Sequence, residues 1–163
     1  MNGGRQESAA TRALPWVSTV VRLVLGGIFV AAGAIKVIDP QTSVQAVRAY
    51  ELLPAGLERV VGWGLPFVEI AVGLLLIAGV FTRIVAAASG LFLMVFIAAV
   101  LSAAARGLNI DCGCFGGGGE VAAGQTSYPA EVARDLGFLL LAGWLVWRPR
   151  SRLGLQRSEE EMT

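Results

Sequence analysis

The chain has 163 residues, of which 55% are hydrophobic and only 15% are charged, and its mean hydropathy is +0.67. This composition excludes an ordinary soluble domain, and a net charge of +1 without a dense basic patch excludes a nucleic-acid partner. Histidine is absent, which removes imidazole haem ligation, the usual mixed zinc sites and every histidine-based triad, so the chemistry left is thiol, carboxylate or none.

Four apolar runs predict membrane spans, because a hydrocarbon core about 30 Å thick needs roughly 20 helical residues. The runs cover residues 16–38, 60–80, 84–105 and 132–147. The fourth is the weakest, since Arg134 and Asp135 interrupt its beginning. A cleaved secretory signal is the alternative for the first run, but that run is longer than a usual signal core and more spans follow it. We therefore predict an all-α integral membrane four-helix bundle over residues 16–147, surrounded by the lipid bilayer.

Basic residues predict the orientation of the bundle. Shorter segments on one side carry most of the arginines, namely the tails 1–15 and 148–163 and the turn that contains Arg83. This bias places both termini in the cytoplasm and the long loop 106–131 outside the cell membrane. The two tails are predicted to be disordered.

Three charged residues fall within the first two predicted spans. An ionised carboxylate such as Glu69 costs roughly 2.5 to 3.5 kcal/mol at the centre of a span, so it should face the bundle and pair with Arg22 or Lys36. A proton relay or a polar pocket for a small molecule such as a quinone is one interpretation, and a structural ion pair or a protonated carboxyl is the other. Pro66 in a first helical turn would bring Glu69 closer to the interface.

Glycines occur in two settings. Those inside the first two spans predict close helix packing, and they are Gly26, Gly27, Gly33, Gly73 and Gly79. Those in the long loop predict backbone flexibility, and they are Gly113, Gly116, Gly117, Gly118 and Gly119. The lysine and strand-to-helix setting of a phosphate-binding loop are missing.

The only two cysteines, Cys112 and Cys114, are separated by Gly113 alone. A disulfide between them needs a bent backbone, which glycine permits, and would be short-looped and strained. Strain and exposure make a disulfide easy to reduce, whereas a structural bridge closes a long loop. The spacing therefore favours a redox-active pair.

Two alternatives remain for the cysteines. They are small apolar residues at the end of a helix, or they bind a metal together with Asp111 or Glu120. Structural zinc normally takes four ligands with wider cysteine spacing, so we predict no metal. Arg106 and the amino end of the next helix are the candidates to lower a thiol pKa.

Several motifs resemble one family over nearly the whole chain, from about residue 17 to residue 147. They are Arg22 to Phe29, Gly33, Lys36, Asp39-Pro40, Tyr50 to Pro54, Leu65-Pro66 with Glu69 and Gly73, and Asp111-Cys-Gly-Cys-Phe-Gly116. The helix motifs are similar to the broad DoxX-like membrane proteins. The Cys-Gly-Cys-Phe-Gly loop resembles the MauE branch of that group.

The resemblance implies a four-span protein that acts with a thioredoxin-like partner in forming the disulfides of methylamine dehydrogenase. It implies that Cys112 and Cys114 are the exchanging pair, in a component of a thiol-disulfide oxidoreductase system. A quinone is the candidate cofactor for reoxidising that pair. The alternatives are a non-catalytic membrane scaffold and a quinone- or small-molecule-binding transport bundle, which with four spans would have to form an oligomer.

Overall fold

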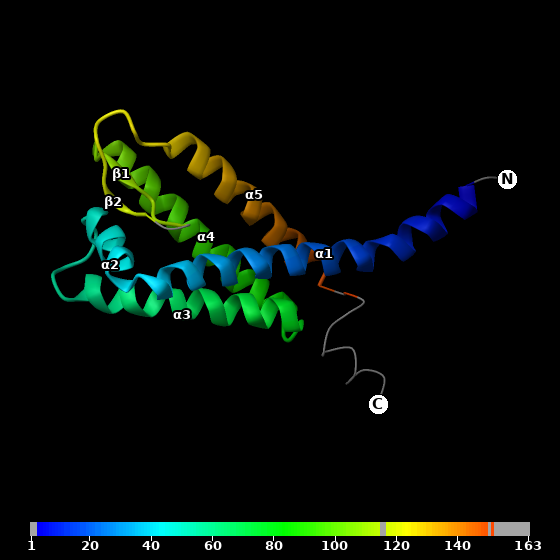
Figure 1. The fold of residues 1–163 in the computed structure, drawn as a ribbon. Coiled ribbons are helices and arrows are strands. Elements are labelled where there is room, and N and C mark those ends of the chain that lie inside the picture. Colours follow the sequence, from blue (N-terminus) through cyan, green and yellow to red (C-terminus); the bar gives the residue numbers. More distant parts are fainter. Residues whose placement is uncertain (1–2, 115–116, 150, 152–163) are drawn as a thin grey trace.

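The computed structural model describes residues 3–114, 117–149 and 151. Four long helices form the body, and a short helix and a two-stranded ribbon cover one end of it (Figure 1). The elements are α1 (Gly3–Ile38), α2 (Pro40–Ala49), α3 (Leu57–Ala78), α4 (Thr82–Ala105), β1 (Ile110–Asp111), β2 (Gly119–Glu120) and α5 (Tyr128–Trp147). The predicted all-α membrane fold with four long helices is confirmed.

Three of the long helices are long and apolar enough to cross a membrane, over Leu14–Ile38, Leu57–Ala78 and Thr82–Ala105. The fourth helix, α5, forms where a span is predicted but is not one of the three. Its first two turns carry Glu131, Arg134 and Asp135, and both carboxylate side chains are buried. The charges that weaken the apolar run therefore point into the bundle.

Helix α1 begins at Gly3, within the amino-terminal tail 1–15 for which disorder is predicted. The segment is rich in alanine, with arginine, glutamine and glutamate, which all have high helix propensity. Figure 1 shows these first turns extending beyond the other helices. Most of the predicted carboxyl-terminal tail, 148–163, lies outside the described residues.

Helix α2 lies in a connection for which no helix is predicted. Its start carries a standard signal: Asp39 accepts a hydrogen bond from the Thr42 backbone N–H at 3.2 Å, and Pro40 occupies the first turn. The helix packs on α3, where the Ser43 hydroxyl donates to the Gly62 carbonyl at 2.8 Å. This contact helps to hold α2 against α3, where α2 also lies next to the loop that carries Cys112 and Cys114.

Helices α1 and α3 approach each other closely at glycines. A Cβ atom on Gly73 would lie 2.6 Å from the Gly26 carbonyl oxygen, and one on Gly33 would lie 2.6 Å from the Pro66 carbonyl oxygen. The packing role predicted for these three glycines is confirmed. Gly27 has no such neighbour, and Gly79 instead ends α3 with a left-handed backbone, φ 71°.

Large apolar side chains cover much of the outer surface of the long helices. Such exposure is unfavourable in water and suits a lipid environment. The most exposed include Val60, Phe67, Ile84, Val95, Leu140 and Trp147. Smaller side chains, with Leu25, Leu76 and Leu145, fill the space between the helices.

Candidate functional site

Cys112 and Cys114 lie in the turn between β1 and β2, which we call the cysteine loop. Ile110 pairs with Glu120 and Asp111 with Gly119, so the chain turns back immediately after the cysteines. Gly113 has φ 68°, and a Cβ atom there would lie 2.7 Å from the Ala46 side chain of α2. Only glycine fits this turn without displacing α2.

The other described loop glycines, Gly117 to Gly119, also have positive φ values. Gly116 lies outside the described residues. The flexibility expected of these glycines stays a prediction, but the backbone conformation that they allow is what packs the loop on α2.

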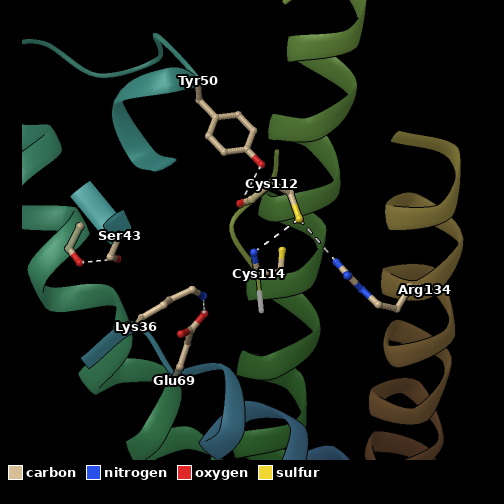
Figure 2. Close-up of polar contacts among 8 residues, drawn as sticks. Lys36, Ser43, Tyr50, Glu69, Cys112, Cys114 and Arg134 are labelled. Atoms are coloured by element: carbon tan, nitrogen blue, oxygen red, sulfur yellow. Dashed lines mark hydrogen bonds and ion pairs between the residues drawn. The ribbon is translucent and has the colours of Figure 1, made fainter. Parts of the chain in front are cut away.

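The two thiols lie side by side at the inner end of the loop. Cys112 is buried and Cys114 is half-buried, and both are free. The Cys112 sulfur accepts hydrogen bonds from the Cys114 backbone N–H at 3.5 Å and from the Arg134 guanidinium at 3.7 Å (Figure 2). The structure therefore brings together the two residues predicted to form a redox pair.

These contacts make the two thiols unequal. Hydrogen bonds from the Cys114 thiol, the Cys114 backbone N–H and Arg134 lower the pKa of Cys112 despite its burial. The same thiol–thiol hydrogen bond, together with burial, raises the pKa of Cys114. Of the two thiols, Cys112 is thus the one that loses its proton more readily.

A buried tyrosine lies on the other side of the loop. The Tyr50 hydroxyl donates to the Cys112 carbonyl at 3.4 Å, and burial raises the pKa of that hydroxyl. Arg106, a candidate to approach the thiols, donates instead to the Tyr50 carbonyl at 2.5 Å. Its predicted role is therefore taken by Arg134, on the helix that follows the loop.

Sequence reasoning treated the charges at the start of α5 as interruptions of a span and missed their place at the site. Glu131, Arg134 and Asp135 are three and four residues apart, a spacing that puts them on one helix face. Arg134 Nε also pairs with Asp135 Oδ1 at 3.1 Å, which orients the guanidinium. That spacing is the signal that could have identified them.

The intramembrane carboxylate has a single ion-pair partner among the described residues. Lys36 Nζ lies 2.5 Å from Glu69 Oε1, and both side chains are buried. Arg22, the other predicted candidate, is buried elsewhere in the bundle and donates to the Ser151 hydroxyl at 3.0 Å. Pro66 lies inside α3 rather than in its first turn, so Glu69 stays near the middle of the helix.

A partly open apolar pocket extends from the Cys114 thiol to the Glu69 carboxylate of this ion pair. Cys114 lines it at one place and Glu69 at another. Aromatic rings cover much of the rest, and they are Phe29, Phe92, Phe96 and Phe138. The ring centroids of Phe29 and Phe92 are 5.7 Å apart and those of Phe92 and Phe96 are 5.0 Å apart.

The chain is similar to known proteins over most of its length. A family model described as methylamine utilisation protein MauE matches residues 14–148. A Paracoccus denitrificans protein named methylamine utilization protein MauE is 37% identical over 105 residues, which are 64% of this chain and 56% of that relative. The chain thus matches only about half the length of that relative, and no solved structure matches the chain. Because the family model extends from the first membrane-spanning segment to the end of α5, the chain belongs to the MauE family of membrane proteins.

Proposed function

We propose that Cys112 and Cys114 exchange a disulfide with a thioredoxin-like partner during the maturation of a redox enzyme, within methylamine utilisation as the relative's name indicates. The observation that carries this proposal is the unequal thiol pair, in which Arg134 faces the Cys112 sulfur. Thiol exchange needs one sulfur that leaves readily as a thiolate and a second that is accessible to attack. Cys112 meets the first requirement and the half-buried Cys114 meets the second.

In the oxidising direction, a partner thiolate attacks the Cys114 sulfur of the Cys112–Cys114 disulfide. The bond between the two cysteines breaks, and Cys112 leaves as a thiolate beside Arg134. The second thiolate of the partner then attacks the partner's own sulfur in the mixed disulfide, and Cys114 leaves and takes up a proton. The partner loses two electrons and two protons, the pair gains the electrons, and the remaining proton passes to solvent. Reduction of the partner follows the same steps backwards.

The orientation is part of the proposal: both termini are cytoplasmic and the cysteine loop is outside the cell membrane. In intact cells, a membrane-impermeant maleimide is expected to label Cys114, and the buried Cys112 to a smaller extent, only after a reductant is added, as measured by intact mass. That result indicates an outward-facing disulfide. Labelling only after the membrane is opened would show that the loop faces the cytoplasm. Labelling without a reductant would show that the two cysteines are not joined in a disulfide in the cell.

Reoxidation of the pair needs a two-electron acceptor, for which we propose a quinone in the phenylalanine-lined pocket. A quinone takes two electrons from the dithiol and two protons, and Glu69, which lies at the pocket wall and accepts a hydrogen bond from the Lys36 ammonium, is positioned to relay a proton. Glu69→Gln is expected to slow reoxidation of the purified, reduced protein by added quinone, within the roughly 10²- to 10⁴-fold range of a positioned acid. Glu58→Gln, at the start of the same helix and outside the pocket, is the matched control. Unchanged reoxidation in Glu69→Gln would remove the quinone proposal.

A further inference from the structure

Three potential metal ligands converge where the cysteine loop meets α5. Asp111 ends β1, Cys112 follows it, and Glu131 projects from the first turn of α5. One ligand atom from each of these side chains lies within 4.8 Å of the other two. Cys112 and Glu131 are buried, and Asp111 is half-buried.

The Glu131 carboxylate supplies a second, independent observation. The residue is only 8% exposed, and its Oε2 atom has no hydrogen-bond partner among the described residues. A buried acceptor without a partner costs about 1–3 kcal/mol, and more when the group is charged, so such atoms are rare in folded proteins. The same carboxylate hydrogen-bonds to Cys112 and lies close to the Asp111 carboxylate, so its unsatisfied oxygen belongs to a group that is in the position of a cation ligand.

We propose that the reduced cysteine loop binds a divalent cation of the zinc type through Asp111, Cys112 and Glu131. One thiolate with two carboxylates combines soft and hard donors, which suits a borderline cation such as Zn²⁺. Tetrahedral zinc needs a fourth ligand, and the Cys114 thiol, hydrogen-bonded to Cys112, is the nearest candidate sulfur.

The charges of the surroundings fit this cation. Two carboxylates and the Cys112 thiolate carry three negative charges, which attract a divalent cation. The Arg134 guanidinium, 3.7 Å from the Cys112 sulfur and ion-paired with Asp135, lies beside the ligand set and orients that sulfur. Of the two carboxylates that the sequence offered as partners of the cysteines, Asp111 belongs to this cluster, whereas Glu120 lies on β2 with an exposed side chain.

Binding would make the loop sensitive to its oxidation state. The cation displaces the Cys112 thiol proton, and a Cys112–Cys114 disulfide removes the thiolate that holds the cation. The reduced loop therefore binds metal and the oxidised loop releases it. This inference goes beyond disulfide exchange and does not depend on any exchange partner.

The test is equilibrium binding of Zn²⁺ to the detergent-purified full chain after reduction and removal of the reductant, with Co²⁺ as a spectroscopic probe of thiolate ligation. About one Zn²⁺ per chain is expected, with a sulfur-to-cobalt charge-transfer band. Glu131→Gln is expected to weaken binding by more than the roughly 10- to 100-fold that loss of an outer-shell partner costs. Cys112→Ser should remove the charge-transfer band, and Glu120→Gln is the matched control that should bind like the unmodified chain.

The wild-type measurement keeps the proposal falsifiable if a variant does not fold. Absence of stoichiometric binding by the reduced wild-type chain overturns it, and so does equal binding by the disulfide form. Equal affinity in a folded Glu131→Gln variant also overturns it. Because no exchange partner is present, these outcomes are independent of whether the proposed exchange function holds.

Discussion

Replacing both cysteines by serine is expected to reduce disulfide exchange with a thioredoxin-like protein to background, since Cys112 and Cys114 are the only sulfurs that can form a disulfide. The single variants should differ. Cys112→Ser removes the leaving thiolate but keeps the accessible Cys114, so a mixed disulfide should accumulate with a single-cysteine partner whose sulfur is supplied as a thionitrobenzoate disulfide, from which Cys114 displaces thionitrobenzoate. Cys114→Ser leaves only a buried thiol, and the mixed disulfide should form far less. Non-reducing gel electrophoresis with mass spectrometry measures both.

Two arginine substitutions, one beside the Cys112 sulfur and one away from it, provide the control for this experiment. Arg134→Met removes the cation beside the Cys112 sulfur and should slow exchange. Arg106→Met removes an arginine that contacts the Tyr50 carbonyl instead, and it serves as the control for Arg134→Met.

If the double cysteine variant still supports maturation of the target enzyme while disruption of the helices abolishes it, the protein acts as a membrane scaffold. Mixed disulfides that form equally through either cysteine would contradict the assigned roles.

The sequence predicts the helices well because membrane insertion depends on the length and polarity of local segments. The predicted spans 60–80 and 84–105 end or begin within three residues of α3 and α4. By contrast, α2 was missed because its amphipathic pattern is short, and only the Asp39-Pro40 start indicates it.

The site was only partly predictable for a different reason. The adjacency of Cys112 and Cys114 follows from their spacing alone. The arrival of Arg134 and Glu131 beside them depends on how the ribbon folds back and how α5 packs on α4, which are long-range contacts. The sequence likewise could not decide whether Lys36 or Arg22 is the ion-pair partner of Glu69, because that too depends on a long-range contact. The close approach of α1 and α3 at their glycines places Lys36 beside Glu69.

The buried ion pair leads to the second large effect. Lys36→Met is expected to lower the free energy of unfolding by about 3–5 kcal/mol, because it leaves the Glu69 carboxylate buried without its partner charge. The double variant Lys36→Met with Glu69→Leu should recover most of that loss, since no charge is then left buried. Thermal and denaturant unfolding in detergent, followed by circular dichroism, measures the free energies of the wild type, Lys36→Met, Glu69→Leu and the double variant, which together form a double-mutant cycle.

An exposed ion pair in the same protein shows what the result should look like without burial. Arg48 is 61% exposed on its side chain and pairs with Glu58 at 2.9 Å, so Arg48→Met should cost no more than about 1 kcal/mol. If Lys36→Met costs as little as Arg48→Met, the Glu69 carboxylate is neutral in the folded protein and the ion pair does not stabilise the bundle. If instead the double variant stays as unstable as Lys36→Met, the loss comes from the buried packing of the lysine stem, or from the contact of its ammonium with the Phe96 ring, rather than from an unpaired charge.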